Sequence, residues 1–305
     1  MEDLERCPGL YCGRIFFEEN NTWSSCGACP RGYRVNESYA CDLCNEDQPM
    51  YNYLYLGFVA VLPLVMHWFF IDMAAKERGF SRGQLILHFS ALVEVVVAAV
   101  ATLLAMEPQW NLKIHSCRVT RLSDWYTLFH NPTPHYGKKL HCTQEAVYPL
   151  QTMVLLFYFL CLINMMIMRP LLNKKFLKAG KSAVYCALYF LPILTVLHSV
   201  AGGLIYYAFP YLSIVISMIS NATHFSIKLD QSMKSLLKTS VTEIKNVVII
   251  LGHWLLMAYG ILSLRQHYAF LAFVPFPAIF YILTVKFTDP AEFREKDRST
   301  LDRLS

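Results

Sequence analysis

The chain has 305 residues, of which 55% are hydrophobic and only 16% are charged, and its formal net charge is +5. Soluble domains carry about 25% charged residues, so this composition excludes an ordinary soluble domain and indicates a membrane protein. The first ten residues have neither the basic start nor the apolar stretch of a cleavable signal peptide. We therefore expect the chain to enter the membrane on a later segment.

Residues 1–50 are polar, turn-rich and rich in cysteine. Two C-x-x-C pairs, Cys26/Cys29 and Cys41/Cys44, are separated by eleven residues. Four thiolates at this spacing are typical of a zinc site in the cytosol, whereas in an oxidising compartment they form disulfides. The side of the membrane on which this head lies therefore decides its chemistry.

The first apolar segment, residues 51–75, is long enough to cross a membrane. Acidic residues precede it, and Lys76, Arg78 and Arg82 follow it. Because basic flanks stay in the cytosol, we predict that the head lies on the outer side. Disulfides then become the favoured interpretation of its cysteines, and zinc becomes the alternative.

Six further apolar segments are predicted to cross the membrane. They are residues 84–106, 148–168, 183–201, 204–225, 247–264 and 268–286. The 183–225 stretch is too long for one span, and Gly202-Gly203 near its middle predicts a tight helical hairpin at residues 201–204. The sequence thus predicts an all-α multispanning protein with seven transmembrane helices and a small, cysteine-rich, disulfide-stapled domain on the lumenal or extracellular side. Residues 107–146 are predicted to form a loop on that same lumenal or extracellular side, and residues 287–305 are predicted to form a cytosolic tail.

The predicted outer segments hold candidates for two covalent modifications. The disulfide candidates are Cys7, Cys12, Cys26, Cys29, Cys41, Cys44, Cys117 and Cys142. Six head cysteines allow fifteen pairings, among which the sequence does not choose. The two loop cysteines, Cys117 and Cys142, are candidates for one disulfide with each other. Asn20 and Asn36 each begin an N-x-S/T acceptor sequence for N-glycosylation.

Glu94 is the one carboxylate near the middle of the second predicted span. A charge at that depth costs several kcal/mol unless it is paired or protonated. Two interpretations follow: a neutral Glu94 that bonds a neighbouring helix, or a site for a proton or an ion. The histidines of the spans, His67, His88, His198 and His253, are interpreted as contacts between helices or as residues of the membrane interface, and not as ligands. No catalytic or metal-binding motif is apparent, so we expect neither a catalytic residue nor a metal site.

Two cytosolic segments are candidate docking sites. The basic loop contributes Arg169, Lys174, Lys175, Lys178 and Lys181, and the tail contributes Arg294, Lys296, Arg298, Leu301 and Leu304. Unopposed cations next to a membrane bind anionic lipid headgroups. Basic residues followed by spaced aliphatic residues, as in the tail, also resemble a docking segment for a mitogen-activated kinase, although acids interrupt the cations here. The alternative interpretation of the tail is a solvated amphipathic end.

Two partial resemblances bear on the protein class. The pattern C-x-x-C-P-x-G-Y…C-x-x-C, from Cys26 to Cys44, resembles ephrin-receptor-like and tumour-necrosis-factor-receptor-like modules and implies an extracytoplasmic fold. Seven spans with an outer amino terminus suggest a G-protein-coupled receptor. However, the third span ends MMIMRP without an acid-Arg-aromatic triplet, so we do not favour that class.

The whole pattern resembles the family of c-Jun N-terminal kinase-associated membrane proteins. The resemblance rests on the start MEDLERCPGLYCGR, the loop WNLKIHSC…LHC, the seven spans and the short charged tail. It implies a non-enzymatic membrane protein of the endoplasmic reticulum that binds the kinase and prolongs its signalling. It also implies that proteasome subunits, degradation components and a RING-type ubiquitin ligase are recruited to clear misfolded proteins.

Two classes of function therefore remain. The first is an adaptor for stress signalling and degradation, with membrane lipid around it and with no cofactor and no nucleic acid as partner. The second is a transporter or receptor that uses an intramembrane site around Glu94.

Overall fold

A computed structural model describes residues 6–74, 82–131, 142–176, 184–228, 230–266 and 268–288. The chain divides into two compact units, Met1–Tyr207 and Ala208–Ser305. Each unit is described by itself.

The head of the first unit contains only short strands, which are paired in three antiparallel two-stranded sheets. The strands are β1 (Cys12–Gly13), β2 (Phe16–Phe17), β3 (Thr22–Trp23), β4 (Gly27–Ala28), β5 (Tyr33–Val35) and β6 (Cys41–Leu43). So little regular structure buries a small apolar core, which explains why a segment of this size needs covalent links.

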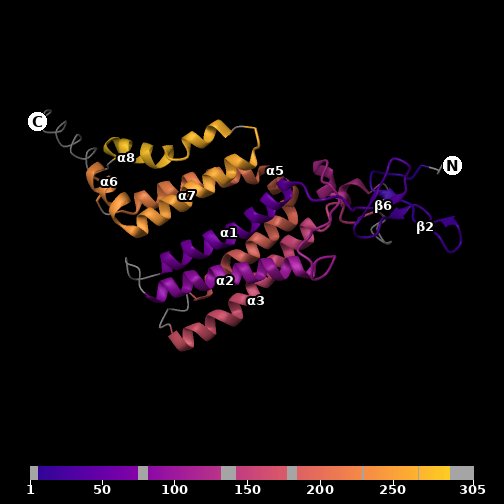
Figure 1. Ribbon diagram of the computed structural model, residues 1–305, viewed down its shortest axis with the longest axis horizontal. Coiled ribbons are helices and arrows are strands. Elements are labelled where there is room, and N and C mark those ends of the chain that lie inside the picture. Colours follow the sequence, from indigo (N-terminus) through magenta and orange to yellow (C-terminus); the bar gives the residue numbers. More distant parts are fainter. Residues whose placement is uncertain are drawn as a thin grey trace, which may run out of the picture. The chain divides into compact units, whose positions relative to one another are not determined.

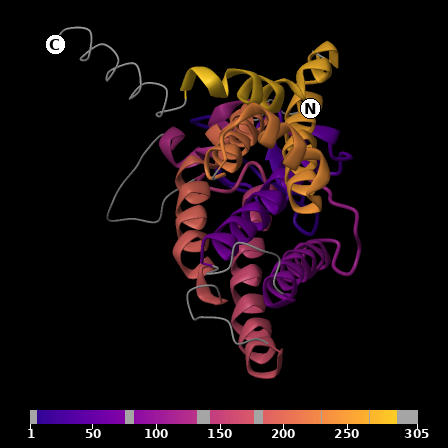
Figure 2. The ribbon, with the colours of Figure 1, turned by 90° about the vertical axis from the view of Figure 1, so that its left-hand side faces the viewer.

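Three long helices follow the head: α1 (Met50–Ala74), α2 (Arg82–Ala105) and α3 (Leu150–Phe176). In Figure 1 α2 lies between the other two, and it packs against both α1 and α3. Figure 2 shows the same helices after a turn of 90°. Helix α2 exposes apolar side chains such as Phe89, which is 65% exposed, and it buries its polar Ser90 and Glu94 together with Leu87 and Ala91. This arrangement suits a hydrocarbon solvent, in which every backbone polar group must be satisfied within the helix.

The loop between α2 and α3 carries two short 3-10 helices, η1 (Leu122–Trp125) and η2 (Thr127–His130). The next long helix, α5 (Ala187–Ser226), contains 40 residues and has non-helical backbone angles at Ala201, with φ −111° and ψ 18°. A straight helix of that length would extend roughly 60 Å, about twice the thickness of the hydrocarbon core. Ala201 is also the first residue of the predicted turn at 201–204, so the backbone break lies where the sequence predicts a turn.

The second unit contains the remaining helices: α6 (Met233–Thr242), α7 (Ile244–Ser263), η3 (Tyr268–Phe273) and α8 (Phe276–Thr288). The short helix α6 packs against both α7 and α8, and η3 packs against α7. Leu236 of α6 lies in a buried cluster with Phe225, Ile250 and Ile282. One apolar cluster thus joins the end of α5, α6, α7 and α8.

The predicted membrane class agrees with the structure, but seven separate spans are not confirmed. Among the described residues, five helices are long and apolar enough to cross a membrane, and α8 is a shorter apolar helix. The predicted spans 183–201 and 204–225 both fall within α5. The predicted span 268–286 is divided between η3 and α8. The difference in α5 arises because only one residue, Ala201, has non-helical backbone angles, and the helix continues through Gly202 and Gly203.

Candidate functional site

Glu94 and Arg169 form an ion pair inside the first unit. Nε of Arg169 donates to the two carboxylate oxygens of Glu94 at 3.0 and 3.1 Å, and Nη2 lies 2.9 Å from Oε2. Both side chains are fully buried. The two-pronged contact is the geometry in which a guanidinium binds a carboxylate most strongly.

Several helices contribute to the surroundings of this pair. Ser90 Oγ donates to Glu94 Oε1 at 2.6 Å, and Arg169 Nη1 donates to the carbonyl of Val184 at 3.1 Å. Nδ1 of His67 lies 2.9 Å from Arg169 Nη2 and accepts its hydrogen, because a guanidinium can only donate. The cluster of His67, Ser90, Glu94 and Arg169, named here the buried ion-pair cluster, therefore connects α1, α2, α3 and the segment before α5.

This arrangement has a clear chemical consequence for Glu94. Arg169 and Ser90 occupy its carboxylate oxygens, so the group is neutralised by a partner and does not face an open cavity. Of the two interpretations from the sequence, the geometry favours a contact between helices over a site for an ion. The predicted contribution of His67 to a helix contact is also found. The pairing of Arg169 with Glu94 was not predicted.

The prediction that Arg169 belongs to an exposed docking loop is wrong for this residue. Helix α3 continues beyond the predicted end of its span at residue 168, so Arg169 lies within a helix and turns inward to Glu94. A buried carboxylate needs a cation within reach. That requirement, applied to the basic residue directly after a span, is the signal by which the pair could have been anticipated.

The other docking candidates remain predictions. Lys174 and Lys175 lie near the end of α3, and Lys174 is exposed. The remaining candidates lie outside the described residues: Lys178, Lys181, Arg294, Lys296, Arg298, Leu301 and Leu304.

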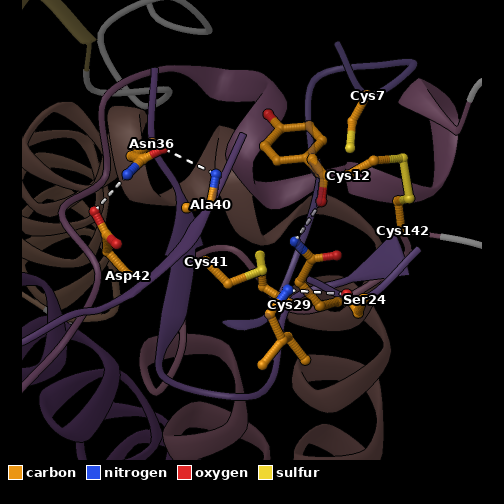
Figure 3. Close-up of a disulfide and its surroundings, with 12 residues drawn as sticks. Cys7, Cys12, Ser24, Cys29, Asn36, Ala40, Cys41, Asp42 and Cys142 are labelled. Carbon is orange, nitrogen blue, oxygen red and sulfur yellow. Dashed lines mark hydrogen bonds between the residues drawn. A yellow bond between two sulfur atoms is a disulfide. The ribbon is translucent and has the colours of Figure 1, made fainter. Parts of the chain in front are cut away.

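All eight predicted disulfide cysteines form disulfides, but not in the expected arrangement. Two bonds stay within the head, Cys7–Cys26 and Cys29–Cys41. The other two, Cys12–Cys142 and Cys44–Cys117, join the head to the loop between α2 and α3, and Figure 3 shows the first of these beside the Cys29–Cys41 bond. The predicted Cys117–Cys142 disulfide is therefore wrong, and the four cysteines of the two C-x-x-C pairs are all engaged in disulfides.

The head and the loop thus form one covalently linked structure, named here the outer assembly (residues 6–49, 107–131 and 142–149). Gly13 of β1 shows how closely its parts pack. A Cβ atom at Gly13 would lie 2.8 Å from the sulfur atoms of both Cys29 and Cys41. Glycine at this position lets the backbone of β1 lie directly against that disulfide.

Asp124 of η1 is the polar centre of the outer assembly. Its carboxylate accepts hydrogen bonds from the hydroxyl of Tyr11 at 3.0 Å, from Arg34 Nη2 at 3.0 Å and from the backbone N–H of Thr120 at 2.9 Å. Burial alone would raise the pKa of Asp124. The Thr120 N–H and the Arg34 guanidinium outweigh burial and hold the pKa below its usual range. Burial raises the pKa of Tyr11 to about 12, so its hydroxyl remains a donor.

The outer assembly also rests directly on the helices of the first unit. Trp125 is 7% exposed and contacts the rings of Tyr55 in α1 and Tyr206 in α5, with ring centroids 5.9 and 5.2 Å away. A Cβ atom at Gly203 would lie only 2.8 Å from Cβ of Trp125. The absent side chain at Gly203 therefore lets the loop approach α5 closely.

The two candidate glycosylation sites differ in their surroundings. Asn20 is exposed in the turn between β2 and β3. Asn36 is half-buried, and its amide nitrogen donates to Asp42 Oδ2 at 2.8 Å while its Oδ1 accepts from the backbone N–H of Ala40 at 2.9 Å (Figure 3).

Within the described ranges, no three His, Cys, Asp or Glu residues come together as ligands for a metal ion. The chemistry present in these ranges is that of structural contacts: disulfides, one buried ion pair and a hydrogen-bonded carboxylate.

Comparison with known proteins places this architecture among relatives. The profile of the family described as JNK1/MAPK8-associated membrane protein matches residues 7–290. A protein of that name from Homo sapiens is 47% identical over 299 residues, which cover 93% of this chain and 94% of that protein. One from Mus musculus is 46% identical with the same coverage, and a homolog from Caenorhabditis elegans is 29% identical over 88% of this chain and 84% of its own length. No solved structure shows significant similarity to the chain.

Proposed function

Because this chain belongs to the JNK1/MAPK8-associated membrane protein family, we propose that it is a non-enzymatic membrane adaptor that binds c-Jun N-terminal kinase and regulates the duration of its signalling under stress. The observation that carries this proposal is the similarity over nearly the full length of the chain. The name of the human relative states an association with the kinase, and this association is what we transfer.

The proposal extends to protein degradation in the endoplasmic reticulum. There the adaptor recruits proteasome subunits and degradation components, together with a RING-type ubiquitin ligase, to clear misfolded proteins. Lys174 is exposed at the end of α3, and Lys175, Lys178 and Lys181 follow it in the sequence. These cations are the proposed docking site for such partners or for anionic lipid headgroups.

The buried ion-pair cluster supports the adaptor over a transporter or receptor centred on Glu94. A transported ion or proton needs a site that can open to it, whereas Arg169 already occupies both carboxylate oxygens of Glu94. The pair is therefore better suited to hold helices together than to bind a ligand.

The topology that we propose places the outer assembly in the lumen and the tail, residues 287–305, in the cytosol. Four disulfides support an oxidising location for the outer assembly. Lys228, Lys234, Lys238 and Lys245, around and within α6, support a cytosolic location for the segment between α5 and α7. Both locations hold together only if α5 crosses the membrane twice, with its turn at the break at Ala201.

Cysteine labelling tests this topology. In sealed microsomes, a membrane-impermeant maleimide should label a Lys238→Cys variant without permeabilisation. A Lys113→Cys variant, in the outer assembly, should be labelled only after detergent is added. The background is low because Cys161 and Cys186, the two free cysteines, are both buried. Protection of Lys238→Cys in sealed vesicles would contradict a double crossing by α5.

Co-purification from cells tests the adaptor function. We expect that deletion of residues 287–305, or replacement of Lys174, Lys175, Lys178 and Lys181 by glutamine, reduces the kinase and proteasome subunits that co-purify with the protein. A Lys113→Gln variant removes a cation from the opposite side and should leave capture unchanged. Full capture by both cytosolic variants would count against docking at these segments.

A further inference from the structure

The β2–β3 hairpin of the head exposes both an aromatic ring and the polar turn that follows it. Phe17 is 50% exposed, and the four residues that connect the two strands, Glu18, Glu19, Asn20 and Asn21, are all exposed. Asn21 adopts a positive φ of 49°, a conformation that asparagine tolerates better than most residues, and this closes the turn. The turn is therefore well defined and presents Asn20 to solvent.

The register of the hairpin brings an aromatic ring beside the acceptor sequence Asn20-Asn21-Thr22. Phe17 and Thr22 are directly paired across the two strands, so their side chains lie on the same face. Phe16 and Trp23, the next pair, lie on the opposite face with ring centroids 5.0 Å apart. The Phe17 ring thus shares its face with the threonine of the acceptor sequence, whereas the Phe16 ring contacts Trp23.

From this arrangement we propose that Asn20 carries an N-linked oligosaccharide, that its first N-acetylglucosamine packs on the exposed ring of Phe17, and that Asn36 stays unmodified. An exposed phenyl ring is stabilised when an apolar surface covers it, and the C–H face of a pyranose is such a surface. The ligand of Phe17 is therefore a sugar attached three residues further along the same turn.

Asn36 lacks these features although it also begins an acceptor sequence. Its amide nitrogen is engaged by Asp42, and its Oδ1 accepts from the backbone N–H groups of Ser38 and Ala40, both at 2.9 Å. These bonds build the turn before β6. A sugar on that nitrogen would have to fit between Asn36 and the strand that holds Asp42.

This inference rests on the proposed lumenal location of the head. The gel mobility of glycosylation-site variants distinguishes a failure of the inference from a failure of the proposed topology. The full chain, expressed in cells with an intact glycosylation pathway, should lose one glycan on digestion with peptide N-glycosidase. Asn20→Gln should abolish that shift, and Asn36→Gln should leave it unchanged. A glycan on Asn36 but not on Asn20 overturns the inference and keeps the topology. If no glycan is found, the inference fails, and labelling of Lys113→Cys then decides whether the topology fails with it.

The role of Phe17 has a separate test. Digestion with endoglycosidase H leaves a single N-acetylglucosamine, and the thermal unfolding of this form is compared with that of the Asn20→Gln variant. We expect the sugar to raise Tm by about 2–4 °C. The gain should disappear in a Phe17→Ala background and persist in a Phe16→Ala background, where the substituted ring lies on the other face. If the sugar raised Tm equally in the Phe17→Ala and Phe16→Ala backgrounds, the sugar would not pack on the Phe17 ring.

Discussion

A charged pair buried between membrane helices is stable only while both partners are present. The guanidinium of Arg169 and the carboxylate of Glu94 are both buried away from water. Removing each charge from water costs free energy, and only the attraction between the two charges offsets that cost. Sequence alone identified Glu94, because a carboxylate in an apolar span is conspicuous. It did not identify Arg169 as the partner of Glu94, because a basic residue at the end of a span normally faces the cytosol.

A double-mutant cycle measures this mutual dependence. Glu94→Gln or Arg169→Gln alone should lower the free energy of unfolding by about 3–5 kcal/mol, since each leaves an unpaired buried charge. The double variant should be more stable than either single variant, because neither charge then remains. Unfolding in detergent micelles provides the measurement. Strictly additive losses would mean that the two side chains do not depend on each other.

The lowered pKa of Asp124 predicts sensitivity to acid. Its folded pKa lies below the unfolded value of about 3.9. The stability that it contributes is therefore present above that pH and is lost as the pH falls through the folded pKa. We expect Asp124→Asn to cost about 1–3 kcal/mol near neutral pH, because Arg34 and Tyr11 lose a charged acceptor.

Tm measured from pH 3 to pH 7 checks this expectation. The difference between the wild type and Asp124→Asn should narrow below about pH 4, where the unfolded carboxyl is protonated. Glu46→Gln, at an exposed position of the same head, is the matched control and should run parallel to the wild type. If the Tm difference between the wild type and Asp124→Asn stayed constant from pH 3 to pH 7, Asp124 would contribute through its shape and not through its charge.

At the scale of elements, the contact between η1 and α5 fixes the outer assembly on the helices. Gly202 and Gly203 offer a direct comparison, since a Cβ atom at Gly202 would be in ordinary contact with Trp125 at 3.4 Å, whereas one at Gly203 would be 2.8 Å away. Gly203→Ala should cost about 1–3 kcal/mol through overpacking. Gly202→Ala should cost little or stabilise the helix. Thermal unfolding of the two variants compares them, and equal effects would refute the close approach at Gly203.

The long helices were predictable because a membrane allows few alternatives. Apolar stretches such as residues 84–106 must become helices in hydrocarbon, and α2 covers Arg82–Ala105. The number of spans was not predictable to the same degree. Whether Gly202-Gly203 ends a helix or only bends it depends on what packs there, and Trp125, which packs there, lies far away in the sequence.

At the scale of the whole molecule, the pairing of the cysteines could not be predicted from the sequence. Cys117 and Cys142 are the only cysteines of their loop, which favoured a bond between them. They pair instead with Cys44 and Cys12 of the head, because the loop folds against the head around Asp124. Head and loop were therefore predicted as separate parts, whereas they form one covalent structure.

This connectivity predicts how the protein responds to a cut in its chain. A protease site introduced within residues 75–81, between α1 and α2, separates a fragment that contains the head and α1 from the remainder. Because Cys12–Cys142 and Cys44–Cys117 both bridge that cut, the fragments should migrate together on a denaturing gel without reductant and separate when reductant is added. Replacing Cys12 and Cys44 by serine should release the fragments without reductant. Replacing Cys7 and Cys26, whose bond stays within the head, should not release them. If the fragments of the wild type separated without reductant, the cysteines of the head would form disulfides only with one another. The head and the loop would then be two separate structures.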